Sequence, residues 1–348
     1  MSSFPFVSVL MPVRNEGEFI RHSLGAVLAQ NYPQDRMEVI VADGRSTDGT
    51  RNTVTEIARQ HTNVLLLDNQ QEIVATGLNL ALGLAKGEII VRVDGHTIIN
   101  TNYVRECVRA LKESGGDNVG GCMSAVSDRA FGRAVAAATS SRFGVGGARF
   151  HYSDREEWVD TVYLGAWKRD VFHRIGKFDE EMVRNQDDEF NYRLRAAGGR
   201  ILLEPRIQSS YFNRATIRSL WKQYFQYGYW KVRVLQKHPR QMQPRQFVPA
   251  FFVLALALLI ITALVVSVGK YILVAIVTTY VIGNLFASTL ASAKAGWQLL
   301  PLISFAFIVI HFAYGCGFLV GLVRFWNRWD FSSRHVEVGQ ASSENASG

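Results

Sequence analysis

The stretch that decides the fold is residues 87–98, which read GEIIVRVDGHTI. Three consecutive apolar residues, Ile89 to Val91, follow Gly87 and Glu88, and Arg92 and Val93 lead to a polar tip that holds Asp94 and His96 around a glycine. This pattern predicts a short buried strand that runs out into a turn. In an open parallel sheet, ligands bind beyond the carboxyl ends of the strands, so the tip is a candidate ligand site.

The composition of this tip suits a divalent metal ion. Asp94 and His96 flank Gly95, so two metal-capable side chains can converge where the backbone also comes close. A carboxylate and an imidazole at this spacing suit Mg²⁺ or Mn²⁺, with a diphosphate and water filling the other positions. The alternative is a surface turn that happens to contain an Asp and a His.

The first hundred residues repeat a strand followed by a helix. Strands are expected at residues 6–13, 38–42, 64–67 and 89–93, and helical spacing of apolar residues follows each of the first three. This alternation predicts a parallel, doubly wound α/β sheet with right-handed crossovers. No G-x-G-x-x-G follows the first strand, so a dinucleotide site has little support.

Polar loops follow the first two strands. The first loop holds Pro12, Arg14, Asn15 and Glu16, and the second holds Asp43, Ser46 and Asp48 among glycines. Backbone amides in a loop between a strand and a helix can meet a nucleotide, and Asp43 can accept hydrogen bonds from a base or ribose. For Asp48 the alternative is a cap on the helix that begins near Thr50.

A third polar segment, residues 185–194, reads NQDDEFNYRL and places three acids in the first turn of a helix. Carboxylates there complement the helix dipole, which is a purely structural explanation. Three adjacent carboxylates nevertheless repel one another more than dipole compensation requires. Their grouping favours a positioned general base whose neighbours tune it.

Three segments in this order, VSVLMPVRNE, VADGRSTDGT and VRVDGHT, resemble the nucleotide-sugar half of family 2 inverting glycosyltransferases with a GT-A fold. The resemblance implies a Rossmann-like, mostly parallel sheet that binds a nucleotide sugar. It assigns to the donor site Pro12, Arg14, Asn15, Glu16, Asp43, Ser46, Asp48 and Asp94. The family's metal motif is usually Asp-x-Asp, and the Asp94–His96 version found here resembles the Asp-x-His of some other GT-A enzymes.

The acceptor side of the family is also recognisable. VDTVYLGAWKRDVF and RNQDDEFNYRL together resemble succinoglycan-type (ExoA-like) exopolysaccharide glycosyltransferases. The family motif Glu-Asp-x-Asp/Glu-Leu-x-x-Arg-Leu makes Asp187 the catalytic base and Glu189 the second acid, with Gln186 in place of the first Glu. The predicted acceptor contacts are Gly165, Trp167, Gln186, Asp188 and Gln223, with core packing as the alternative for Trp167. Of the processive Gln-x-x-Arg-Trp motif only Gln223 matches, which favours transfer of a single sugar.

The last third of the chain is apolar. Runs at residues 247–268, 271–293 and 299–323 are each long enough to cross a bilayer. The basic segment before them indicates a cytoplasmic catalytic domain. Three crossings would then place Arg324, Arg328 and Arg334 outside, so the third run is re-entrant, the count is even, or the positive-inside rule is overridden.

The predicted domains follow from these boundaries. Residues 1–240 form the catalytic domain, with a nucleotide-binding half at 1–100, an acceptor half at 100–213 and an interfacial amphipathic helix at 214–240. Residues 247–323 form about three transmembrane helices, and residues 324–348 a polar tail that we expect to be disordered.

The charge and cysteine content narrow the partners. The chain of 348 residues has 38 Lys and Arg against 30 Asp and Glu, a net charge of +8. Much of the excess lies just before the apolar region, and no nucleic-acid module is recognisable, so we expect an anionic membrane rather than nucleic acid. Three cysteines without metal or pairing spacing indicate a reducing compartment, and the amino terminus reads as a strand, not a signal peptide.

The sequence therefore predicts a multi-pass enzyme of the inner (cytoplasmic) membrane. It would move one sugar from a nucleotide sugar, such as UDP-glucose, to a hydroxyl of a lipid-linked glycan acceptor. The setting would be exopolysaccharide or cell-envelope glycan biosynthesis, with other proteins of that process as candidate partners. The alternatives are a polyprenyl-phosphate glycosyltransferase, which uses a phosphate as nucleophile, and a membrane sensor that binds a nucleotide sugar without turnover.

Overall fold

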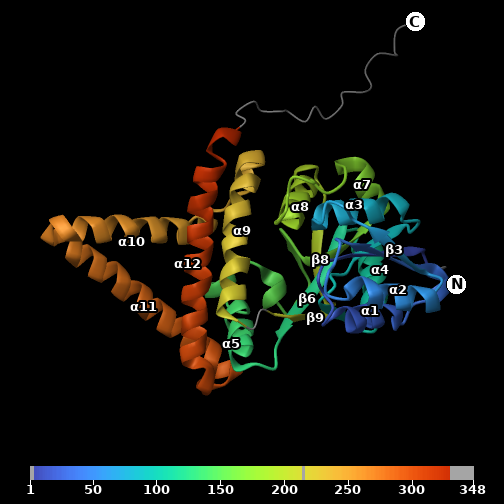
Figure 1. Cartoon of the computed structure of the whole chain (residues 1–348), viewed down its shortest axis with the longest axis horizontal. Coiled ribbons are helices and arrows are strands. Elements are labelled where there is room, and N and C mark those ends of the chain that lie inside the picture. The colour runs from blue at the N-terminus through green and yellow to red at the C-terminus, as the bar shows by residue number, and fades with distance from the viewer. Residues whose placement is uncertain (1–3, 214–215, 330–348) are drawn as a thin grey trace, which may run out of the picture.

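The computed structural model describes residues 4–213 and 216–329, which form an α/β domain with long apolar helices beside it (Figure 1). The strands are β1 (Val7–Val13), β2 (Met37–Asp43), β3 (Val64–Asp68), β4 (Ile89–Arg92), β5 (Thr97–Ile99), β6 (Asn118–Val126), β7 (Glu157–Val159), β8 (Tyr163–Lys168) and β9 (Ile201–Phe212). The helices are α1 (Ile20–Leu28), α2 (Thr50–Gln60), α3 (Val74–Leu84), α4 (Tyr103–Ser114), α5 (Ala130–Thr139), α6 (Arg142–Val145), α7 (Arg169–Ile175), α8 (Gln186–Ala196), α9 (Ile217–Lys237), α10 (Val248–Val265), α11 (Ser267–Ala295) and α12 (Leu300–Arg324).

The described strands form one nine-stranded mixed sheet in the order β3-β2-β1-β4-β8-β6-β9-β5, with β7 added on β9. Strands β1 to β4 are parallel to one another, which confirms the predicted doubly wound half. Strand β8 enters antiparallel between β4 and β6. The sequence did not predict β5, β7 or β9, which complete the acceptor half.

Two cores cover the two faces of the sheet. All seven residues of β1 are buried, as expected of a central parallel strand. Alternate residues point to opposite faces, so Val9 and Met11 join the core under α1, α2 and α4, whereas Leu10 joins the core under α3, α7 and α8. The parallel strands β1, β2 and β4 end at one edge of the sheet, where their polar loops lie together.

The apolar third of the chain forms three helices long and apolar enough to span a membrane, as the sequence predicted. Helices α10 and α11 form a hairpin that projects from the rest of the molecule, whereas α12 lies beside α9 (Figure 1). Residues 330–348, which are most of the predicted tail and include Arg334, lie outside the described residues, as do residues 214–215 of the predicted interfacial segment.

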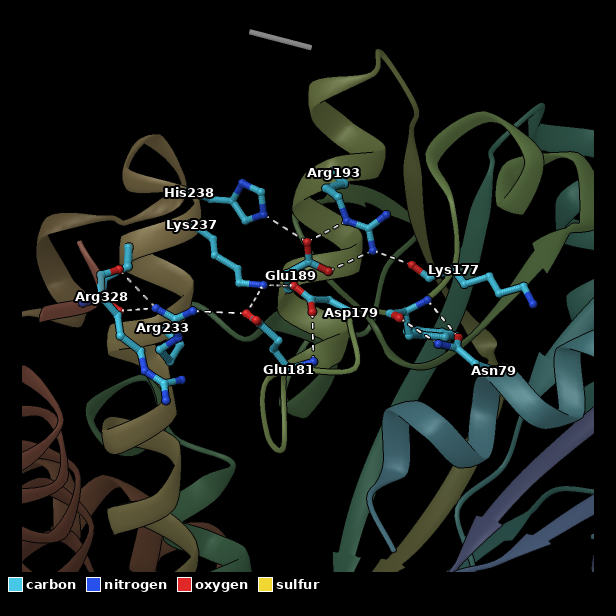
Figure 2. Close-up of polar contacts among 12 residues, drawn as sticks. Asn79, Lys177, Asp179, Glu181, Glu189, Arg193, Arg233, Lys237, His238 and Arg328 are labelled. Atoms are coloured by element: carbon cyan, nitrogen blue, oxygen red, sulfur yellow. Dashed lines mark hydrogen bonds and ion pairs between the residues drawn. The ribbon is translucent and has the colours of Figure 1, made fainter. Parts of the chain in front are cut away.

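Helix α9 differs from its prediction in where its cations point. Arg233 and Lys237 form ion pairs with Glu181, at 3.1 and 2.6 Å, and Lys237 also contacts Asp179 (Figure 2). Lys231, buried on the same helix, pairs with an acid at the start of α8. These three basic side chains therefore bind the catalytic domain, and the expectation that they face lipid headgroups is wrong. The place of α9 as a whole in the headgroup plane stays a prediction.

Candidate active site

A cavity of about 1270 Å³ lies between the edge of the sheet and the helices α9 to α12. Its walls come from the loop after β1, the tip of β4, the start of α8 and parts of the apolar helices. Asp94 and Asp187 both line it, although they lie far apart in the sequence. The fold therefore brings the predicted metal side and the predicted base to a common cleft.

On the donor side, Asp94 accepts two hydrogen bonds from an arginine of the preceding strand. Arg92 donates from Nε to Oδ1 of Asp94 at 2.7 Å and from Nη2 to Oδ2 at 3.0 Å. Burial by itself would raise the pKa of Asp94, but the Arg92 guanidinium outweighs burial and the pKa is lowered. Asp94 is thus a fixed carboxylate.

The tip of β4 can hold a metal ion only together with other ligands. His96 Nδ1 lies 2.8 Å from Glu16 Oε1, which leaves Nε2 as the ring nitrogen available for a metal. Among the residues that the structure describes, no three His, Cys, Asp or Glu side chains gather as a closed metal site. Asp94 and His96 therefore fit an ion whose remaining positions would be filled by a diphosphate and water.

On the acceptor side, Asp187 sits in the first turn of α8. Burial raises its pKa, the neighbouring Asp188 raises it further, and Arg92 opposes both. The amide of Asp188 donates to Oδ1 of Asp187 at 2.9 Å, which orients the carboxylate. A partly buried carboxylate with a raised pKa that opens on a cavity is a candidate general base.

The other two acids of this turn have structural partners. Asp188 Oδ2 accepts from Lys231 Nζ of α9 at 2.7 Å. Glu189 is buried and contacts Arg193 at 2.6 Å and His238 at 3.0 Å (Figure 2). Burial would raise the pKa of Glu189, but the hydrogen bonds from these two partners lower it. Of the three acids, Asp187 is the one whose environment suits a base.

The predicted donor residues separate into those that face the cavity and those that shape its loops. Pro12, Arg14 and Glu16 line the cavity. The residues Asn15, Asp43, Ser46 and Asp48 do not.

Asp43 is fully buried and accepts from Ser46 Oγ at 2.5 Å and from Arg51 Nη1 at 3.1 Å. Ser46 Oγ in turn accepts from the Asn15 amide at 2.9 Å. In place of the expected contact of Asp43 with base or ribose, these residues join the two loops to each other, because the folded loop uses up their polar atoms.

Asp48 is the cap that the alternative reading proposed. It accepts from the Thr50 amide at 3.1 Å and from the Gly17 amide at 2.8 Å. These bonds lower its pKa even though burial would raise it. Asp48 therefore anchors the start of α2 to the first loop instead of facing the nucleotide.

The predicted acceptor residues separate in the same way. Gln186, Asp188 and Gln223 line the cavity, whereas Gly165 and Trp167 do not. Trp167 is 3% exposed and packs against Phe172, Phe178 and Phe190. Gly165 has φ +100, and a Cβ there would lie 2.4 Å from the Trp167 ring. The expectation that Trp167 stacks on a sugar is wrong, and Gly165 serves this packing instead of opening a path for the acceptor.

The sequence reasoning missed several residues of the site. Arg92 and Arg184 line the cavity and both influence Asp94, and Asn69 and Glu72 line it after β3. Arg92 carried a signal in the sequence, because a charged residue inside an otherwise apolar strand requires a partner. Nothing in the local pattern pointed to Arg184, which lies in the loop before α8.

Comparisons with known proteins find relatives among the glycosyltransferases. Residues 8–176 match the family described as "Glycosyl transferase family 2". The chain is 30% identical over 232 residues to the succinoglycan biosynthesis protein ExoA of Rhizobium meliloti, covering 66% of this chain and 70% of that protein. A second relative, 24% identical, is the Methanococcus voltae dolichyl N-acetyl-alpha-D-glucosaminyl phosphate 3-beta-D-2,3-diacetamido-2,3-dideoxy-beta-D-glucuronosyltransferase, covering 67% of this chain and 74% of that protein.

Two solved structures share the fold. The mannosyltransferase PcManGT of Pyrobaculum calidifontis, in complex with GDP-Man and Mn²⁺, has a TM-score of 0.59 at 21% identity and covers 92% of this chain and 88% of its own. S. aureus TarS residues 1–349, in complex with UDP-GlcNAc, has a TM-score of 0.52 at 17% identity and covers 93% and 92%.

This chain belongs to glycosyltransferase family 2. It is a nucleotide-sugar transferase of polysaccharide biosynthesis with a GT-A catalytic domain, and its relatives include an exopolysaccharide enzyme of the predicted type.

Proposed function

We propose that this chain is an inverting enzyme that moves one sugar from a UDP-sugar, such as UDP-glucose, to a hydroxyl of a lipid-linked glycan. The reaction would serve exopolysaccharide or cell-envelope glycan biosynthesis at the inner (cytoplasmic) membrane. One observation carries the proposal: Asp187, a partly buried carboxylate with a raised pKa, opens on the same cavity as Asp94. A base and a donor-side carboxylate that face one cleft are what a direct displacement needs.

The chemistry is a single displacement. Asp187 takes the proton from the acceptor hydroxyl, and that oxygen forms a bond to the anomeric carbon from the face opposite the nucleotide. The bond between the anomeric carbon and the diphosphate breaks, and the diphosphate leaves with the electron pair. Because one in-line attack inverts the centre, no protein nucleophile is needed, as in inverting glycoside hydrolysis.

The donor would lie against Pro12, Arg14 and Glu16, in a loop whose shape depends on Asn15, Asp43, Ser46 and Asp48. A divalent ion, Mg²⁺ or Mn²⁺, would be held by Asp94 and His96, and when bound it supplies charge compensation for the leaving diphosphate. Arg92 donates two hydrogen bonds to Asp94 and lowers its pKa, which favours the ionised carboxylate that a metal ion needs.

The acceptor would enter beside Gln186, Asp188 and Gln223. The same cavity extends to Phe252 of α10 and Tyr280 of α11. A lining that joins a polar reaction centre to apolar helices suits an acceptor with a sugar head and a lipid tail. The name of the M. voltae relative, which describes a dolichyl-linked sugar phosphate acceptor, supports this reading.

A second candidate is a polyprenyl-phosphate glycosyltransferase, which the arginines on the membrane side of the cavity favour. Arg142 and Arg245 line that part of it. A phosphate needs no general base, so the two functions make opposite predictions for Asp187.

The test uses the full chain in detergent or lipid nanodiscs, supplied with UDP-sugars or GDP-mannose and with membrane extracts as a source of acceptor. We expect acceptor-dependent release of nucleoside diphosphate. Asp187→Asn should lower transfer roughly 10²-fold or more while donor binding is retained. Full activity of the variant with a polyprenyl phosphate would identify the second candidate, and donor binding without any release would identify a sensor.

A further inference from the structure

A second, basic cavity of about 650 Å³ adjoins the acceptor side of the catalytic cavity. The charged residues that line it are Arg142, Arg149, Arg195, Arg200, Arg245 and a single acid, Asp160. Three of the arginines, Arg142, Arg195 and Arg245, line both cavities. They therefore stand between the two cavities.

The acids nearby compensate only part of this charge. Arg149 pairs with Glu157, and Arg200 lies 4.5 Å from the centroid of the Trp158 ring. Arg245 Nη2 is 3.7 Å from Asp160 Oδ2, longer than a good hydrogen bond. Several guanidinium groups around one hollow create a positive potential that suits a multivalent anion, and their forked geometry suits phosphate oxygens.

The arginines also sit where polar and apolar linings meet. Arg142 directly precedes Phe143, and Arg245 lies three residues before the start of α10. Phe143 and Phe252 of α10 line the apolar part of the catalytic cavity. A ligand held by these arginines would thus have a sugar-binding centre on one side and apolar helices on the other.

We propose that Arg142, Arg195 and Arg245 bind the diphosphate of a polyprenyl diphosphate-linked acceptor, with its prenyl chain toward Phe252 and its sugar toward Asp187. This rests on the proposed function, because it names the carrier of the hydroxyl acceptor. In this arrangement the diphosphate anchors the acceptor to the protein and is not the nucleophile.

The sequence offers a matched control. The tripeptide Pro-Arg-Gln occurs at residues 239–241 and again at 244–246, each as one short helical turn. Arg245 lines both cavities and Arg240 lines neither. Arg240→Ala therefore removes the same charge from a neighbouring turn.

The experiment measures binding of farnesyl diphosphate and of farnesol to the full chain in detergent, with UDP binding as a check on folding. We expect Arg245→Ala and Arg142→Ala to weaken farnesyl diphosphate binding by about tenfold or more, Arg240→Ala to change it by less than about twofold, and none of them to change farnesol or UDP binding. Equal losses in Arg245→Ala and Arg240→Ala would overturn the site, because removal of any nearby positive charge would then weaken binding. The site would also be overturned if Arg245→Ala and Arg142→Ala weakened binding to phosphatidylglycerol vesicles but left farnesyl diphosphate binding unchanged. The arginines would then contact the anionic headgroups of the membrane lipids. Neither readout requires turnover, so failure of the reaction and failure of this site are distinguishable.

A different observation concerns the apolar helices themselves. Half of the most apolar stretch of α12 is buried inside the protein, against 17% for α10 and for α11. Helix α12 runs parallel to α9 in direct contact (Figure 1). At Gly228 and Gly317 the two backbones leave no room for a Cβ, and near its end Gln236 Nε2 donates to Phe325 O at 2.7 Å.

Helix α9 cannot cross a bilayer, because it carries five cations along its 21 residues. These are Arg218, Lys222, Lys231, Arg233 and Lys237. Because α12 packs along most of the length of α9, the two helices lie at the same depth relative to the membrane. The exposed residues of α12 form one helical stripe, which includes Pro301, Phe305, Ile308, Val320 and Val323. One apolar stripe on an otherwise covered helix is typical of a helix lying flat at the bilayer surface.

The hairpin has the opposite character. The outer parts of α10 and α11 are exposed except where the two helices meet, with Leu264 at 82% and Tyr271 at 77%. Eighteen residues of α10 span about 27 Å, close to the thickness of a hydrocarbon core. The turn at Val266 lies four residues from Lys270, a cation placed to reach the far headgroups.

We further infer that α10 and α11 are the two membrane crossings and that α12 lies flat beside α9. Arg324 and Arg328 then lie on the same side as the catalytic domain, and among the described residues of the hairpin Lys270 stands alone as the cation at the far side. This even count satisfies the positive-inside tendency, which three crossings would violate.

Single cysteines test the topology. In a Cys122→Ser, Cys316→Ser background, where Cys107 is buried, Ser267→Cys and Asn327→Cys are labelled with a membrane-impermeant maleimide in spheroplasts and in inverted vesicles. We expect Ser267→Cys to react in spheroplasts and Asn327→Cys to react in inverted vesicles. Reaction of both in spheroplasts would show three crossings, and reaction of both in inverted vesicles would show a hairpin that does not cross. Either result overturns the inference.

Discussion

The two sides of the catalytic cavity hold partly buried aspartates in opposite electrostatic states. Asp94 is fixed by two hydrogen bonds from Arg92 and its pKa is lowered, whereas burial and Asp188 raise the pKa of Asp187. Both carboxylates are partly buried, so burial does not distinguish them. Their partners do, and the difference assigns a permanent anion to the donor side and a proton acceptor to the acceptor side.

Arg92 links the two sides. It binds Asp94 directly, and its charge also opposes the rise in the pKa of Asp187. Burial would lower the pKa of this arginine, but the two aspartates raise it, so the guanidinium stays charged. This cation therefore acts on both carboxylates, and substitutions around it can break or sharpen the contrast between them.

The largest effect is expected from loss of the donor-side anion. Asp94→Ala should lower sugar transfer by about 10²- to 10³-fold, because the site for charge compensation at the diphosphate is lost. Excess EDTA should have a comparable effect on the unaltered protein and no further effect on the variant. Diphosphate release is the readout, and activity that survives EDTA would show that Asp94 and His96 hold no metal ion.

A smaller effect, roughly tenfold at neutral pH, is expected from Arg92→Met. Removal of this cation raises the pKa of Asp187, because the one nearby charge that opposes the rise is gone. The base is active when deprotonated, so activity falls as the pH falls through its pKa. The acidic limb of the kcat/KM profile should therefore move to higher pH, and a limb that stays in place would separate Arg92 from the base.

Asp188→Asn should move the same limb in the other direction. The carboxylate of Asp188 raises the pKa of Asp187, so its neutralisation lowers that pKa and extends activity to lower pH. At neutral pH we expect a change of less than about threefold, because the variant keeps the carboxylate that takes the proton. Opposite shifts in Arg92→Met and Asp188→Asn would confirm that one titrating group governs the limb.

The smallest effect on activity is expected from Trp167→Phe. Trp167 lies in the aromatic core, and its buried Nε1 has no hydrogen-bond partner among the described residues. Phenylalanine keeps the ring packing, so we expect a loss of about 1–2 kcal/mol in the free energy of unfolding and an unchanged KM for acceptor. Thermal unfolding and acceptor titration measure the two, and a raised KM would return Trp167 to the acceptor site.

Much of the fold could be predicted from the sequence because its first half depends on local patterns. The alternation of buried strands and amphipathic helices between residues 6 and 100 fixes a parallel sheet, and the polar segments at Asp94 and Asp187 stand out against it. The added strands β5, β7 and β9 were not predictable in this way, since they are held by pairing with distant segments.

The site shows the same division at the level of single residues. The sequence alone singled out Asp94, His96 and Asp187 as candidate site residues. It also determined the apolar character of residues 247–323. Only the tertiary structure decided that Asp43 faces a loop, that Trp167 faces the core, and that the cations of α9 face the catalytic domain. The physical reason is that residue type and spacing determine local conformation and burial tendency, whereas the partner of a polar side chain is chosen by elements that the chain brings together only when it folds.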